Sequence, residues 1–158
     1  MQKITPFLWF NSDAEEAVNF YTSIFKNSKL HTITRYGKTG PGPEGTVMTV
    51  AFELEGQQFL ALNGGPQFRF TEAVSFVVDC ENQQEIDHYW NKLSDGGEIQ
   101  MCGWLKDKFG LSWQIVPKNF GAMISTGDPG RSERVMNAMM GMKKMDMGEL
   151  QKAFDGEE

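Results

Sequence analysis

The residues with the clearest capacity for chemistry lie between Gly103 and Pro117. Alternation in this segment predicts two strands joined by a polar turn that ends at Gly110. On the second strand, the indole of Trp113 and the amide of Gln114 would then lie on opposite faces. An amide directed into a cavity offers a donor and an acceptor to a small molecule, with aromatic neighbours as apolar walls. Directed outwards, Gln114 is a solvated strand residue, and alternation alone does not decide which face is buried.

Length, charge and cysteine content narrow the classes of function. The 158 residues fit one compact domain or two small packed modules. A net charge of −6 and no basic run longer than Lys143–Lys144 argue against a nucleic-acid or anionic-membrane partner. Cys80 and Cys102 lack the spacing of a zinc or redox site, so we expect two buried free thiols. No stretch has the length of a membrane span or a signal peptide, and we expect a soluble, cytoplasmic protein.

The first half of the chain predicts a strand, a helix and then further strands. The apolar segment Ile4–Phe10 reads as a strand, and Ser12 with Glu15 has the spacing of a capping box. Apolar residues at helical spacing follow from Ala14 to Phe25. Three β-favouring segments come next, over residues 29–36, 46–55 and 58–63.

The second half repeats the order of the first. A strand is expected over residues 72–79, and Asn82 with Glu85 repeats the capping-box spacing. The apolar stripe of the helix that follows coincides with that of the first helix when the two are overlaid. Two more strands are expected, over residues 98–104 and 111–117. This order predicts an α+β fold built from two related modules.

The composition changes after Pro117, where six of the ten methionines lie between Met136 and Met147. We expect one helix marked by Val135, Met139 and Met142, and a last short helix capped by Asp146. Flexible thioethers can fill a groove on the same domain or on a second subunit, or they can form an adaptable lid over a ligand. Packing is the commonest role of apolar helix positions, and composition leaves the other two open.

Five segments carry a resemblance to a known family: Phe20–Tyr21, Asn63–Pro66, Phe70–Val78, Cys102–Asp107 and Phe109–Gln114. Together they resemble the PhnB-like branch of the glyoxalase/bleomycin-resistance (vicinal oxygen chelate) superfamily, a branch also named 3-demethylubiquinone-9 3-methyltransferase. The resemblance implies paired βαβββ modules whose curled mixed sheets surround a shared cavity, commonly in a homodimer. We therefore expect this domain over residues 1–126, with modules 1–66 and 67–126, and a Met-rich helical tail over 127–158.

The resemblance also implies where a metal would bind, because metal-using members take His, Gln or Glu ligands from four strands. The equivalent places here are Thr5, a position from Ala61 to Asn63, Ala73 and Gln114. Only Gln114 is a credible ligand, and one amide oxygen does not hold a divalent ion. His31 and His88 read as solvated or hydrogen-bonded surface residues. We expect no metal and no cofactor, since the chain also lacks a glycine-rich turn for a nucleotide-like methyl donor.

Aromatic and polar residues of both modules are the predicted ligand contacts: Phe7, Trp9, Asn63, Phe70, Ser75, Trp104 and Gln114. Each could instead serve core packing or a turn, and Asp107 reads as a turn carboxylate with weak surface ion pairs.

Our first functional hypothesis is a metal-free protein that binds an aromatic or amphipathic small molecule. One alternative is an enzyme of the same superfamily: a metal-assisted isomerase, lyase or dioxygenase, or the methyltransferase of the family name. Such an enzyme would use a recruited metal, or Gln114, Ser75 or Asp107 in proton handling. The other alternative is a dimeric scaffold without a ligand.

Overall fold

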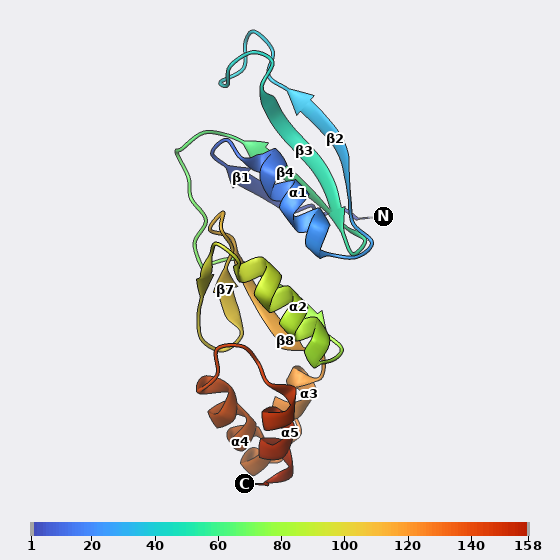
Figure 1. The fold of residues 1–158 in the computed structure, drawn as a ribbon, viewed down its shortest axis with the longest axis vertical. Coiled ribbons are helices and arrows are strands. Elements are labelled where there is room, and N and C mark those ends of the chain that lie inside the picture. The colour runs from blue at the N-terminus through green and yellow to red at the C-terminus, as the bar shows by residue number, and fades with distance from the viewer. Residues whose placement is uncertain (1, 158) are drawn as a thin grey trace. The chain divides into compact units, whose positions relative to one another are not determined.

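The computed structural model describes residues 2–157, and the chain forms two compact units divided between Phe70 and Thr71. Each unit contains one four-stranded mixed sheet with a helix on one face (Figure 1). Among the described residues, no helix is long and apolar enough to cross a membrane.

The first unit has the order strand, helix and three strands. Its elements are β1 (Phe7–Phe10), α1 (Ala14–Ile24), β2 (Lys29–Arg35), β3 (Val47–Leu54) and β4 (Gln57–Asn63). In sheet 1 the order is β1-β4-β3-β2, with β1 parallel to β4 and the other neighbours antiparallel. The apolar stripe of α1 covers one face of this sheet, where Val18, Tyr21 and Phe52 are fully buried.

The second unit repeats that order, which confirms the predicted pair of βαβββ modules. Its elements are β5 (Ser75–Cys80), α2 (Gln83–Ser94), β6 (Glu98–Ile99), β7 (Trp104–Lys106) and β8 (Ser112–Pro117). Sheet 2 has the order β5-β8-β7-β6, with β5 parallel to β8. As predicted, Asn82 caps α2, and its side chain accepts a hydrogen bond from the backbone N–H of Glu85 at 2.9 Å.

The strand expected over residues 98–104 is wrong, because a loop separates β6 from β7. Cys102 and Gly103 have φ angles of 60° and 81°, a left-handed conformation that a strand does not accommodate. Cys102 is also only partly buried, whereas the sequence predicted two buried thiols. Cys80 is fully buried as expected, and burial raises the pKa of its thiol to about 12.

The residues after β8 form three helices that belong to the second unit: α3 (Phe120–Ile124), α4 (Pro129–Met140) and α5 (Met147–Asp155). The connection between α4 and α5 accepts hydrogen bonds from the backbone N–H groups of Cys102 and Gly103, each 2.8 Å long. Val135, Met145 and Leu150 are buried, so packing within the unit accounts for these apolar positions. The Asp146 cap is confirmed, α3 was not predicted, and α4 ends before Met142.

The start of α1 differs from the predicted capping box of Ser12 and Glu15. Asp13 is the N-cap residue and its side chain makes no capping hydrogen bond. The orphan N–H of Ala14 instead donates to Oδ1 of Asn63 at 2.9 Å, and Nδ2 of Asn63 donates to the Val47 carbonyl at 3.2 Å. A side chain at the end of β4 therefore ties the helix to the sheet, which local sequence spacing does not reveal.

This geometry predicts unequal effects of two alanine substitutions at the start of α1. Asn63→Ala should lower the free energy of unfolding by about 1–2 kcal/mol, because the Ala14 N–H and the Val47 carbonyl lose their partner. Asp13→Ala should change it by less than about 0.5 kcal/mol, since that side chain makes no cap. Urea denaturation followed by tryptophan fluorescence measures both, and equal losses would contradict the assignment of the cap to Asn63.

The turn between β7 and β8 is held by Asp107, which is 2% exposed. Its Oδ1 accepts hydrogen bonds from the backbone N–H groups of Phe109 (2.8 Å) and Leu111 (3.1 Å), and its Oδ2 accepts one from the indole of Trp113 (2.9 Å). Asp107 is a turn carboxylate as expected, but it is buried among N–H donors, whereas the sequence predicted a surface group.

Replacing this carboxylate should destabilise the second unit. In Asp107→Asn one carboxylate oxygen becomes an NH2 group, so at least one of these buried N–H donors loses its acceptor, at a cost of about 2–3 kcal/mol. Asp95→Asn, which makes the same chemical change at the exposed C-cap of α2, should cost less than about 0.5 kcal/mol. The midpoint of urea denaturation compares the two variants, and a midpoint for Asp107→Asn equal to that of the control would refute this role.

Candidate ligand-binding site

Sheet 2 has one face toward α2 and one face away from it, which we call the distal face of sheet 2. The predicted alternation on β8 is confirmed: Trp113 and Ile115 are buried toward α2, and Gln114 lies on the distal face. Pairing across the strands arranges the distal face in rows. One row is Ser75, Ser112, Lys106 and Glu98, and the next is Val77, Gln114 and Trp104.

The three predicted site residues of the second unit, Ser75, Trp104 and Gln114, share this face. Nε2 of Gln114 donates a hydrogen bond to Oγ of Ser75 at 2.9 Å. That bond fixes the amide and leaves its Oε1 as an acceptor, while the Ser75 hydroxyl keeps its own proton to donate. Trp104 lies directly opposite Gln114 on β7, so an indole plane and an amide are neighbours.

Ser112 adds an unusual polar group to the first row. It is 0% exposed, and its Oγ is the only buried side-chain N or O atom within residues 2–157 that lacks a hydrogen-bond partner. Leaving a buried hydroxyl unpaired costs about 1–3 kcal/mol, so folded proteins rarely keep one without a compensating role.

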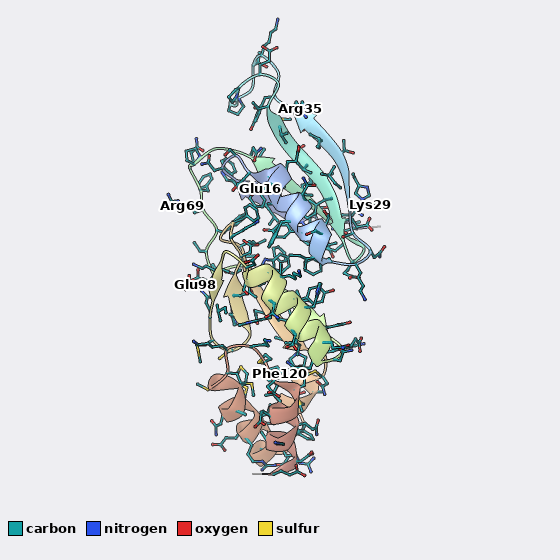
Figure 2. The ribbon with its side chains drawn as sticks, in the orientation of Figure 1. Glu16, Lys29, Arg35, Arg69, Glu98 and Phe120 are labelled. Carbon is teal, nitrogen blue, oxygen red and sulfur yellow. The ribbon has the colours of Figure 1, made fainter. Side chains whose placement is uncertain are left out.

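Lys106 provides the cation of the first row. Its Nζ lies 2.5 Å from Oε1 of Glu72, a residue of the turn before β5. This pairing raises the pKa of Lys106 and lowers that of Glu72, and the charge of Glu98 raises the pKa of Lys106 further. Lys106 is therefore protonated and Glu72 ionised at neutral pH. Glu98, labelled in Figure 2, lies on β6 at the edge of the sheet.

The four predicted site residues of the first unit lie in different local settings. Phe7 is 54% exposed and shares the face of β1 that points away from α1 with Trp9. The Trp9 indole N–H donates to the Gly65 carbonyl at 2.9 Å, and a Cβ at Gly64 would lie 2.4 Å from the ring. Asn63 is the cap of α1, and Phe70 packs edge-on against Phe10 at 5.2 Å.

A cleft of about 730 Å³ in the first unit was not predicted from the sequence. It is lined by the start of α1, the loop after β2 and the turn after β4, including Tyr36 and Asn63. Asp13, Glu15 and Glu16 give it an acidic wall, and Figure 2 labels Glu16 on α1. Among the predicted contacts only Asn63 reaches this cleft, and its amide is already engaged by Ala14 and Val47.

His31 is a hydrogen-bonded surface imidazole, as expected. Its Nε2 lies 3.2 Å from Oε1 of Glu53, which also accepts a 2.6 Å hydrogen bond from Gln58. The hydrogen bond from Gln58, followed by that from His31, lowers the pKa of Glu53.

Sequence reasoning did not predict that Ser112, Lys106 and Glu72 lie beside the candidate residues of the distal face. The signal for Ser112 was present, because a residue two positions from Gln114 on a strand lies on the same face. The place of Lys106 could not be predicted without the register between β7 and β8. The place of Glu72 depends on the conformation of the turn before β5.

The positions that would hold a metal in this superfamily do not fit one. Ala61 and Ala73 carry no donor, and Thr5 offers only a neutral hydroxyl. The amides of Asn63 and Gln114 are already hydrogen-bonded, the first to Ala14 and Val47 and the second to Ser75. The described part of the chain also contains no converging group of three His, Cys, Asp or Glu side chains.

The repeated βαβββ order and the two mixed sheets define the glyoxalase/bleomycin-resistance class, also called the vicinal oxygen chelate superfamily. Within it, residues 2–116 match the model of the family described as 3-demethylubiquinone-9 3-methyltransferase, and the chain belongs to this PhnB-like family.

Solved structures agree with this membership. A PhnB protein from Bacillus cereus is 45% identical, with a TM-score of 0.68 over 73% of this chain and 99% of that one. Protein PA1353 from Pseudomonas aeruginosa is 21% identical, with a TM-score of 0.62 over 75% of this chain and 98% of that one. The fosfomycin resistance protein FosX from Listeria monocytogenes is 15% identical, with a TM-score of 0.52 over 73% and 90%. The last two show a shared fold, and no curated protein matches the chain.

Proposed function

We propose that this protein binds an aromatic or amphipathic small molecule on the distal face of sheet 2, without a metal. The observation that carries the proposal is the buried Ser112 hydroxyl without a partner, next to the hydrogen-bonded pair of Gln114 and Ser75. A ligand that supplies a partner to Ser112 would remove the cost of leaving that hydroxyl unpaired.

The composition of the face supports this proposal. Trp104 and Val77 offer apolar surface in the same row as Gln114, and Val77 is 54% exposed. Small-molecule sites commonly combine apolar walls with a few fixed polar groups that orient the ligand. The Gln114 amide meets the second requirement, because its bond to Ser75 holds it in one orientation.

The first test is a search for ligands by tryptophan fluorescence with a library that includes quinones and aldehydes. We expect saturable quenching by at least one compound, and Trp104→Phe should remove most of the signal. Gln114→Ala should weaken binding about tenfold, through loss of a hydrogen-bonding amide. Gln57→Ala, an exposed position on β4 of the first unit, is the matched control and should bind as the wild type does.

Two results would contradict the proposal. Absence of saturable quenching by any compound would favour a scaffold without a ligand. Equal affinities of the wild type and Gln114→Ala would move the binding site away from this face.

The metal-free part of the proposal has its own test. Elemental analysis of the purified protein should find less than stoichiometric divalent metal, and treatment with a chelator should leave ligand affinity unchanged. The physical reason is the poor donor set at the four expected positions. Stoichiometric metal that is lost in Gln114→Ala would overturn this part and favour a metal-assisted enzyme of the superfamily.

Other expectations from the sequence stay predictions: the homodimer, the cytoplasmic location, the cavity shared by both modules and the ligand contacts of Phe7, Trp9, Asn63 and Phe70. The same holds for the proposed boundaries of the domain, its modules and the tail. Met136 and Met140 of the tail are exposed. A role for them as a lid over a ligand or as a contact with a second subunit stays a prediction.

A further inference from the structure

We infer that the ligand of the distal face of sheet 2 carries an oxyanion, bound by Lys106 and Ser112, and that Glu72 occupies the place of that oxyanion until the ligand displaces it. This inference rests on the proposed function and specifies the chemical class of the ligand: an apolar or aromatic body with a carboxylate, phosphate or sulfonate group.

The first row of the face is a line of hydrogen-bond donors. Lys106, Ser112 and Ser75 are direct cross-strand neighbours on β7, β8 and β5. The Lys106 ammonium carries three N–H donors, and Glu72 Oε1 lies against one side of it. The Ser112 hydroxyl has no partner, and Ser75 accepts from Gln114, which leaves its own O–H to donate. Three neighbouring donor groups with one positive charge match an oxyanion better than a cation or a neutral group.

Glu72 indicates that a carboxylate can be accommodated beside Lys106. Its Oε1 makes a charge-assisted contact with Nζ of Lys106. The Glu72 side chain is 51% exposed and lies in a turn, so moving it into water requires no strand to open. Exposed ion pairs of this kind contribute little stability, so a ligand carboxylate can replace Glu72 beside Lys106. Ser112 is 0% exposed, so contact with its hydroxyl requires the ligand to displace the groups that cover it as well.

The second row accounts for the rest of the ligand. Trp104 and Val77 flank Gln114 and present apolar surface beside the donors. A ligand with its charged group on the first row would therefore place its body along the indole, where stacking favours an aromatic ring. The Gln114 Oε1 lies between the two regions and can accept a hydrogen bond from the ligand body.

Two fluorescent probes with the same aromatic body separate the contribution of the anion. Anilinonaphthalene sulfonate carries a sulfonate group, and phenylnaphthylamine is the same molecule without it. We expect Lys106→Met to weaken sulfonate binding about tenfold and to change binding of the neutral probe less than twofold. Ser112→Ala should weaken only the sulfonate probe, about threefold, whereas Glu72→Gln should strengthen it by a similar factor because the internal competitor is lost.

Control variants separate this site from general charge effects and from misfolding. Lys118→Met removes another lysine that pairs with a glutamate, Glu81 at 2.9 Å, and should leave both affinities unchanged. Lys106→Arg keeps the positive charge and should retain sulfonate binding if Lys106→Met loses it through charge. Displacement of the bound sulfonate probe by benzoate or by phenyl phosphate then identifies which oxyanion the site prefers.

The outcomes distinguish the two levels of the proposal. If both probes bind and Trp104→Ala weakens both, but Lys106→Met weakens neither or both equally, the inference of an anionic ligand is wrong and the site remains. If neither probe shows saturable binding that Trp104→Ala weakens, the proposed function fails together with the inference.

Discussion

The buried carboxylate of Asp107 is the constraint on which the candidate site depends. It gathers two backbone N–H groups of the turn and the Trp113 indole, so the end of β7 and the start of β8 are fixed relative to each other. The register between these strands then places Lys106 beside Ser112 and Trp104 beside Gln114. A shift of one residue would move each of these side chains to the opposite face of the sheet. A group with no contact to the proposed ligand thus determines which side chains could meet it.

The two units apply one order of elements to two different chemical faces. In each unit the first strand pairs in parallel with the last strand, β1 with β4 and β5 with β8. The last strand of each unit pairs on its other side with the third strand, β3 or β7. On the face of sheet 1 that points away from α1, Phe7 lies opposite Leu60 and Trp9 lies opposite Leu62, and Thr34 lies opposite Thr49 further along the sheet. That face of sheet 1 therefore combines apolar side chains near β1 with polar ones near β2, whereas the distal face of sheet 2 has one polar row and one row with Trp104 and Val77 beside Gln114.

The sequence predicted the features that depend on local periodicity. Alternation identified the opposite faces of Trp113 and Gln114, and helical spacing identified the buried stripes of α1 and α2. It failed where a distant residue decides the structure. Asn63 replaces a local capping box across 49 positions of the chain, and the pairing of Glu72 with Lys106 depends on a turn without a sequence period. Gln114 could be identified from the sequence, whereas most residues of the polar row beside it could be identified only from the register of the strands.

The unpaired hydroxyl of Ser112 is hard to explain by folding alone. Alanine at this position would fill nearly the same volume and would leave no polar group without a partner. The serine lowers the stability of the free protein, because its buried hydroxyl makes no hydrogen bond that would offset the loss of water. A residue that reduces stability without a structural benefit is typical of binding sites, where the missing partner arrives with the ligand. Ser112 lies between Lys106 and Ser75, and all three groups can donate hydrogen bonds. The missing partner is therefore expected to be a hydrogen-bond acceptor.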